Sequence, residues 1–91
     1  MYHFFLWFLS KTVIKNYKIT YDYVRHNYFI YRTARFKVIE CFNIIRTSEK
    51  CFRVFYFADL PSGVKFDYKT FKSARFTSMF INTIASESLA I

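Results

Sequence analysis

The chain has 91 residues, a length expected for one domain near the lower limit of what buries a self-sufficient core. A hydrophobic content of 54% argues against disorder, and 14 Lys and Arg against 6 Asp and Glu give a formal net charge of +8. A small, apolar and strongly basic chain indicates a polyanion or neighbouring proteins as partners, although a solvated basic face accounts for the same charge.

The first predicted elements are a strand and a long helix. Residues 4–9 form a short continuous apolar run, which favours a strand covered on both faces. Ser10 follows as a helix N-cap, since its hydroxyl can accept hydrogen bonds from amides of the first turn. Apolar residues then recur three and four positions apart from Ile14 to Tyr28, which predicts an amphipathic helix. A strand over residues 20–24 is the alternative, because β-branched and aromatic residues are poor helix formers.

Two further strands are separated by a polar segment. Residues 27–33 are expected to leave the helix, and residues 34–45 predict a second strand around Val38. Polar residues follow at 46–51 and lead into residues 52–57, whose aromatic and β-branched side chains favour a strand.

The last third of the chain starts with a turn. The only proline and the only glycine, Pro61 and Gly63, mark a loop over residues 58–65. Residues 66–70 alternate aromatic and polar side chains, as a half-exposed strand does, and extended structure is expected to about Phe80. Residues 82–91 predict a helix that begins but is not completed.

Side chains for catalysis or metal binding are scarce. His3 and His26, the only histidines, have no carboxylate or cysteine companion at ligand or triad spacing. The six acids are scattered, which leaves no general acid and base pair. Cys41 and Cys51 lack zinc-ligand spacing; a disulfide across a hairpin is open, and two reduced thiols are favoured. We therefore expect no enzyme activity, no metal, no cofactor and no small-molecule substrate.

Cationic side chains interleaved with aromatic ones are the pattern that carries chemistry. Lys and Arg can contact phosphate oxygens, while aromatic faces can stack on splayed RNA bases. For Phe52, Phe55, Phe57 and Phe66, core or interface packing is favoured over base stacking, and a solvated face is the alternative for the cations. The candidate RNA-binding cations are Arg32, Arg35, Lys37, Arg46, Lys50, Arg53, Lys65, Lys69, Lys72 and Arg75.

Two short motifs occur in order along the second half of the chain. The first is a polar arm with a threonine and a base before a phenylalanine-led strand, and the second is aromatic, acid, any residue, base, threonine. The residues in these motifs are Thr47, Lys50, Phe52, Phe66, Asp67, Lys69 and Thr70. This order resembles the tenth protein of the small ribosomal subunit, the S-ten family. The loop between the motifs is shorter than in the family, and Phe71 stands where the family usually has histidine.

The resemblance implies an α+β, ferredoxin-like βαββαβ fold. Residues 1–91 would be one ribosomal-protein domain, with a long extended arm at about 43–53 and an incomplete second helix and last strand. The absent last strand would leave residues 4–9 with an open edge, which we expect a partner chain to cover.

The function implied by the resemblance is that of a structural constituent of the mitochondrial small ribosomal subunit, in its head. Small-subunit rRNA and the third, ninth and fourteenth proteins of the subunit would be its partners in translation. Thr47 on the arm and Thr70 join the cations as RNA-binding residues, and Lys69, Thr70 and Lys72 would contact the RNA backbone.

The aromatic-rich composition indicates an AT-biased genome such as an organelle's, so we expect an organelle-encoded protein of the mitochondrial matrix. No targeting leader is evident. The apolar start is about half as long as the roughly 20 residues of a membrane helix, and no membrane span is expected. The alternative function is a small accessory subunit of an organelle respiratory membrane complex, with residues 4–9 at a membrane interface. An RNA-binding module outside the ribosome is a third possibility.

Overall fold

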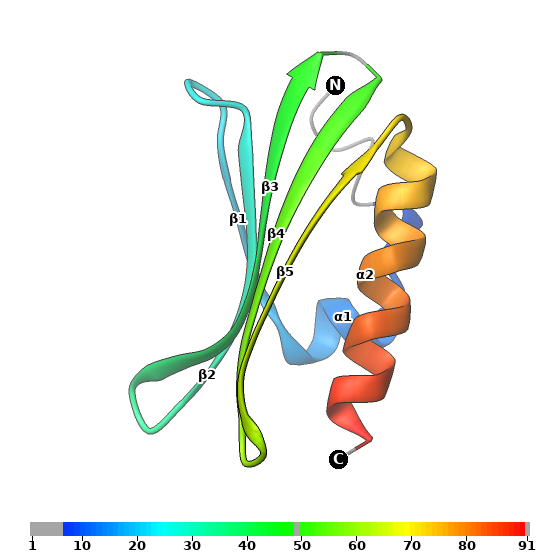
Figure 1. Ribbon diagram of the computed structural model, residues 1–91. Helices are drawn as coiled ribbons and strands as arrows, with labels where there is room; N and C mark the ends of the chain where they lie inside the picture. Colours follow the sequence, from blue (N-terminus) through cyan, green and yellow to red (C-terminus); the bar gives the residue numbers. More distant parts are fainter. Residues whose placement is uncertain (1–6, 49, 91) are drawn as a thin grey trace.

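One antiparallel sheet with two helices against one of its faces makes up the fold (Figure 1). The structure is a computed structural model that describes residues 7–48 and 50–90. The five strands of these residues lie side by side in sequence order, and each is antiparallel to the next. The elements are α1 (Lys11–Asn16), β1 (Lys18–Asp22), β2 (Asn27–Ala34), β3 (Lys37–Ser48), β4 (Cys51–Leu60), β5 (Gly63–Phe71) and α2 (Ala74–Leu89).

The first helix begins where the sequence predicts but ends much earlier. The Ser10 hydroxyl caps α1 by accepting a 3.3 Å hydrogen bond from the Val13 amide, which confirms the predicted N-cap. Tyr17 already has extended backbone angles, φ −119° and ψ 150°, so α1 has only six residues. The predicted helix to Tyr28 is therefore wrong, and the alternative strand was closer to β1.

The apolar stripe of the predicted helix does not form one buried face, although Tyr17 and Tyr28 are core residues. Ile14 and Val24, two members of the stripe, are exposed. Strand pairing of Ile19 with Ile30 and of Tyr21 with Tyr28 buries side chains of the same segment instead. β-branched and aromatic residues suit this pleated arrangement better than a helix.

The turn between β1 and β2 is closed by an aspartate. Oδ1 of Asp22 accepts hydrogen bonds from the amides of Val24, at 3.0 Å, and Arg25, at 3.3 Å. The carbonyl of His26 accepts a 3.0 Å hydrogen bond from the Arg46 amide in β3. This turn reverses the chain, so that the expected exit segment becomes strand β2.

The predicted extended arm is the hairpin of β3 and β4. Cross-strand pairs run from Glu40 opposite Ala58 to Ser48 opposite Cys51, so residues 43–53 lie in the sheet and the turn at its end. Alternate side chains of both strands are buried against the helices, which gives the segment a core of its own. Cys41 pairs with Phe57, not with Cys51, and both thiols are free.

The strands predicted over residues 52–57 and 66–70 are confirmed as parts of β4 and β5. The turn between them contains only Pro61 and Ser62. The expected extended structure to Phe80 is wrong, because α2 starts at Ala74. Ser73 is its N-cap, and the Ser73 hydroxyl accepts a 3.1 Å hydrogen bond from the Phe76 amide.

Helix α2 is complete within the described residues, with 16 residues. Its inner face is built mainly of small side chains at helical spacing, which lets the helix approach the sheet closely. These buried residues are Ala74, Thr77, Ser78, Ile81 and Ala85. Asn82 joins α2 to the start of α1 through two hydrogen bonds of 2.9 Å. Its Oδ1 accepts one from the Ser10 amide, and its Nδ2 donates the other to the Phe8 carbonyl.

The ferredoxin-like prediction is therefore wrong. A meander of neighbouring strands with both helices at the chain's ends replaces the two βαβ units that βαββαβ requires. Of the predicted first strand, residues 4–6 lie outside the described residues, and residues 7–9 form no strand. The described sheet has β1 and β5 at its edges, and residues 7–9 are not part of either edge.

Candidate nucleic-acid interface

The sheet face opposite the helices is rich in aromatic side chains. Directly paired residues in an antiparallel sheet point to the same face, so the register defines rows of neighbours across the strands. One row consists of Lys18, Tyr31, Cys41, Phe57 and Phe66, and the next consists of Thr20, Phe29, Asn43, Phe55 and Tyr68. We call these two rows the aromatic face.

Two ring pairs stand at the β4–β5 side of the aromatic face. The ring centroids of Phe55 and Tyr68 are 4.8 Å apart, and those of Phe57 and Phe66 are 5.3 Å apart. Phe66 is 74% exposed and Tyr68 is 51% exposed, so the core does not explain these rings. Soluble proteins rarely leave such apolar groups contiguous and open unless they bind something.

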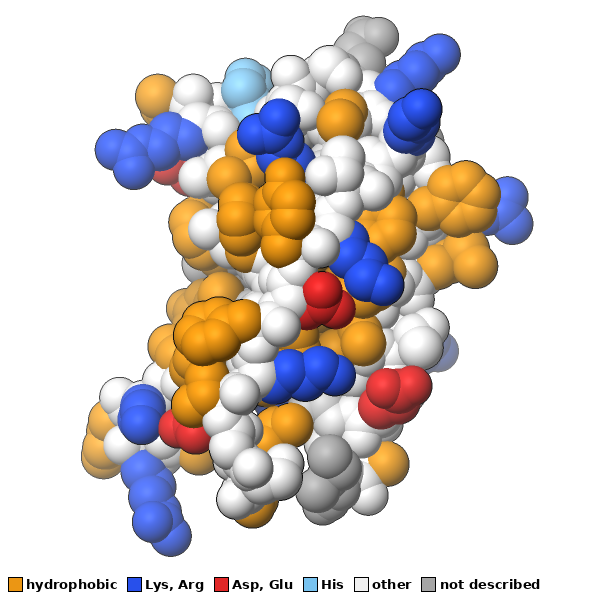
Figure 2. Space-filling model, viewed as in Figure 1, with side chains coloured by type: hydrophobic (Ala, Val, Ile, Leu, Met, Phe, Trp, Pro, Cys, Tyr) orange, Lys and Arg blue, Asp and Glu red, His pale blue; other side chains and the backbone are white. Residues whose placement is uncertain are grey.

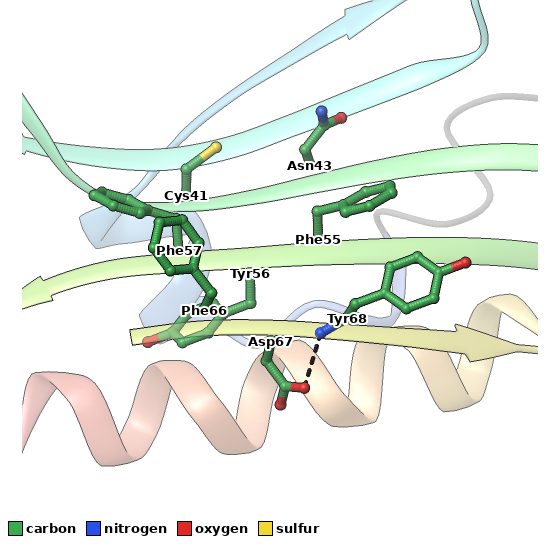
Figure 3. Close-up of a pocket in the computed structure, with 8 residues that line it drawn as sticks. All are labelled: Cys41, Asn43, Phe55, Tyr56, Phe57, Phe66, Asp67 and Tyr68. Atoms are coloured by element: carbon green, nitrogen blue, oxygen red, sulfur yellow. Dashed lines mark hydrogen bonds between the residues drawn. The ribbon is translucent and has the colours of Figure 1, made fainter. Parts of the chain in front are cut away.

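The ring pairs border an open hollow of about 700 Å³. Figure 3 shows Cys41 and Asn43 rising from β3 beside the rings of Phe57 and Phe55. Burial raises the pKa of the Cys41 thiol, which favours the neutral form. The hollow is therefore a largely aromatic groove, with the Asn43 amide on its β3 side and Asp67 among the residues of its β5 side.

One end of the sheet is basic. The β1–β2 turn, the β3–β4 turn and the link from β5 to α2 all lie there, at the top of Figure 1, and Figure 2 shows Lys and Arg side chains along that end. Asp22 is its only acid among the described residues, and the turn amides already engage it. The cations placed at this end are Arg25, Arg46, Lys50, Arg53, Lys72 and Arg75.

Arg53 and Thr70 link the basic end to the aromatic face. They are direct cross-strand partners, two residues along β4 and β5 from the pair Phe55 and Tyr68, and therefore lie on the same face as these rings. A guanidinium and a hydroxyl donor thus stand beside the groove, where a phosphate oxygen of a stacked strand would pass.

Other predicted RNA-binding residues have partners inside the protein. Nε of Arg32 donates to Glu40 at 2.9 Å, and Nζ of Lys37 lies 3.2 Å from Oδ2 of Asp59. Nε of Arg46 donates to the Ser48 carbonyl at 3.3 Å.

The remaining predicted residues fall at three places. Lys69 points to the helix side, with Nζ 5.3 Å from the Phe80 ring centroid, and the Thr47 hydroxyl donates to the Cys51 carbonyl at 3.4 Å. Arg35 lies in the β2–β3 turn at the far end of the sheet, and Lys65 lies near that end in β5.

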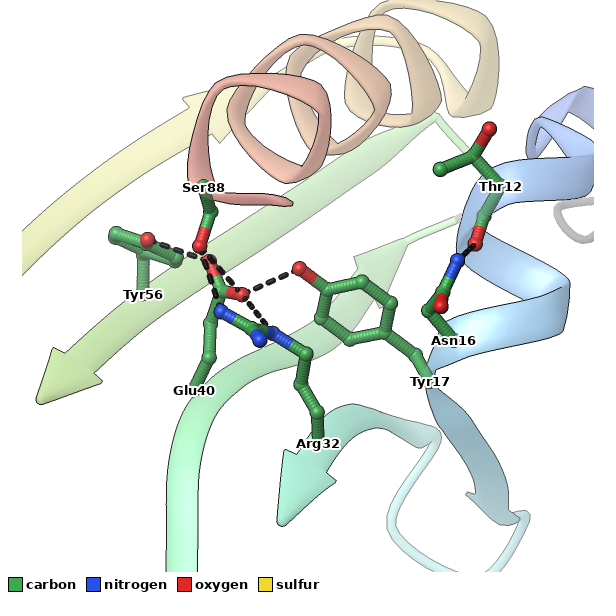
Figure 4. Close-up of polar contacts among 7 residues, drawn as sticks. All are labelled: Thr12, Asn16, Tyr17, Arg32, Glu40, Tyr56 and Ser88. Atoms are coloured by element: carbon green, nitrogen blue, oxygen red, sulfur yellow. Dashed lines mark hydrogen bonds and ion pairs between the residues drawn. The ribbon is translucent and has the colours of Figure 1, made fainter. Parts of the chain in front are cut away.

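A buried carboxylate beneath the sheet fixes this arrangement. Glu40 is 0% exposed and accepts hydrogen bonds from four side chains of four different parts of the chain (Figure 4). Oε1 accepts from the Tyr17 hydroxyl, from Nε of Arg32 at 2.9 Å and from the Ser88 hydroxyl at 3.0 Å, and Oε2 accepts the Tyr56 hydroxyl at 2.6 Å. The network ties both ends of the helical layer to β2, β3 and β4, which holds the strands in register.

The sequence did not reveal Asn43, Tyr68 or Glu40 as site or network residues. A signal was present, because β3 alternates between the two faces, and Glu40 is the single acid on its buried side. For four phenylalanines the sequence left open either packing or base stacking. Phe52 is 4% exposed and packs in the core, whereas Phe55, Phe57 and Phe66 lie on the aromatic face.

Residues 7–48 and 50–90 contain no group of three or more His, Cys, Asp and Glu side chains that could hold a metal ion. No helix in this part of the chain has the length and apolar character needed to cross a membrane.

Comparisons with protein-family models, with curated proteins and with solved structures found no match to this chain. Its class is therefore defined by the fold and the face alone: an antiparallel five-stranded meander, over the described residues, with helices on one side and an open aromatic groove on the other.

Proposed function

We propose that the chain binds single-stranded RNA on the aromatic face. The observation that supports this function is the two tilted ring pairs, Phe55 with Tyr68 and Phe57 with Phe66, which lie beside an open groove on the sheet face opposite the helices. Aromatic side chains on such a surface stack on unpaired bases, and each stacked base contributes about 1–3 kcal/mol.

The charge distribution favours RNA over an apolar protein surface as the ligand. The chain has a formal net charge of +8, and Arg53 stands on the same face as the rings. A bound strand would lay its bases across the groove and its phosphates toward the basic end, releasing counterions.

Fluorescence anisotropy with a labelled single-stranded RNA of mixed sequence tests the proposal. Changing Phe55 and Tyr68 together to Ala should weaken binding at least tenfold, because two stacking surfaces are lost. The matched control is Phe76→Ala, which removes an exposed ring from α2 on the other side of the sheet and should leave affinity unchanged. Equal losses for both variants, or no RNA binding by the unchanged protein, would refute the proposal.

Arg53→Ala probes the phosphate contact. It should reduce the slope of log affinity against log salt concentration by about 1, because one phosphate contact is removed. Arg32→Ala would not serve as a control, because its guanidinium holds Glu40 in the fold.

Membership of the mitochondrial small ribosomal subunit stays a prediction. The ferredoxin-like fold that the S-ten resemblance implied is not the fold of this chain, so the aromatic face is now the main support for an RNA-bound role. Sedimentation of a detergent-solubilised organelle extract, with and without ribonuclease, tests it. Co-migration with the small subunit that nuclease abolishes would support the prediction, and migration with a nuclease-resistant respiratory complex would refute it.

A further inference from the structure

The centre of the aromatic face holds a polar atom without a partner. Oδ1 of Asn43 is buried and accepts no hydrogen bond from any described residue. Leaving a buried acceptor unsatisfied costs roughly 1–3 kcal/mol, and native proteins keep few such atoms. Asn43 lines the groove, so a ligand there can supply the missing donor.

The neighbours of Asn43 determine how a ligand would approach it. Phe55 is its direct partner on β4 and Phe29 its direct partner on β2, so rings stand on both sides of the amide. The Phe55 ring in turn contacts the Tyr68 ring, with an angle of 49° between the ring planes. A base stacked on these rings would present its edge to the amide, whose unpartnered Oδ1 can only accept a hydrogen bond.

The burial of Oδ1 favours a donor that projects from the base. The exocyclic amines of adenine, cytosine and guanine extend beyond the ring and carry two hydrogens, whereas both exocyclic groups of uracil are carbonyl oxygens. A carbonyl oxygen placed against Oδ1 would leave two acceptors facing each other. Asn is a common partner of adenine because its amide can donate and accept at the same time.

We infer that Asn43 makes the aromatic face selective for bases with an exocyclic amine, such as adenine and cytosine, over uracil. This inference rests on the proposed RNA binding and adds the base class that the same groove recognises. Stacking supplies affinity without sequence preference, while the amide supplies the discrimination.

Anisotropy titrations with labelled eight-nucleotide oligomers of adenine, cytosine and uracil test the inference. The unchanged protein should bind the adenine and cytosine oligomers about tenfold more tightly than the uracil oligomer, the range of one good hydrogen bond. Asn43→Leu, which has nearly the same shape, should reduce the preference to less than twofold and leave affinity for the uracil oligomer unchanged. Asn43→Val is a second variant that suits a strand and also lacks the amide.

The outcomes separate the inference from the proposed function. If all three oligomers bind equally to the unchanged protein, and Phe55→Ala weakens all of them, the face binds RNA and the inference about Asn43 is wrong. If the preference persists in both Asn43 variants, stacking strength and not the amide is its source, and the inference is again overturned. If none of the oligomers binds, the proposed function itself fails.

Discussion

Removing the buried carboxylate of Glu40 is expected to destabilise the protein strongly. In Glu40→Gln the guanidinium of Arg32, a side chain that is 22% exposed, faces a neutral amide. An NH₂ group, which only donates, replaces one of the two carboxylate oxygens. The hydroxyls of Tyr17 and Tyr56 then compete for a single acceptor. Breaking a buried ion pair from one side costs about 3–5 kcal/mol, which is a large share of the stability of a small domain.

Urea unfolding followed by far-ultraviolet circular dichroism measures this effect. The midpoint should fall while the slope of free energy against urea stays unchanged, because the surface exposed on unfolding is nearly the same. Tyr56→Phe is a milder variant, expected to cost about 1.5–3 kcal/mol because it removes one hydrogen bond to a charged group. The control is Glu87→Gln, which changes an exposed acid on α2.

A double-mutant cycle decides whether the network acts as described. Arg32→Met should cost less in the Glu40→Gln background than alone, because the charge that it neutralises is already gone. Additive costs, or a Glu40→Gln midpoint equal to that of the unchanged protein, would refute the reasoning that Glu40 and Arg32 belong to one stabilising buried network.

Two further predictions follow from local geometry. Burial raises the pKa of Tyr28 from 10.0 to about 12, and it raises the pKa values of Tyr17 and Tyr56 further. Above pH 10 these tyrosines therefore ionise in the unfolded chain before they ionise in the folded protein, so the free energy of unfolding should fall. Urea unfolding at pH 8 to 11 should show a shallower decline in Tyr28→Phe; an equal decline would contradict the assignment. The two-residue β2–β3 turn has φ 54° at Arg35 and φ 63° at Phe36, so Arg35→Asn with Phe36→Gly should stabilise by about 1–2 kcal/mol and raise the melting temperature. Changing both to Ala keeps the strain and should give no such rise.

The sequence by itself determined several local features. Ser10 was predicted as a helix cap because its hydroxyl acts on amides only three residues away, and the strands around residues 54 and 68 followed from local alternation. Pro61 located the turn between them, since its fixed φ acts locally. The basic, aromatic composition predicts a polyanion partner, and this stays a prediction.

Only the tertiary structure decided which face of the sheet the helices cover. Alternation shows that Phe55 and Val54 point to opposite sides, but both are apolar, so it cannot tell which side is the core. The inner face of α2 consists mainly of small residues, too weakly apolar to stand out from the sequence. Glu40 is satisfied by residues from 8 to 48 positions away, and such long-range pairing depends on the whole fold because no local pattern encodes it. For the same reason the groove around Asn43 exists only once strands β2 to β5 lie side by side.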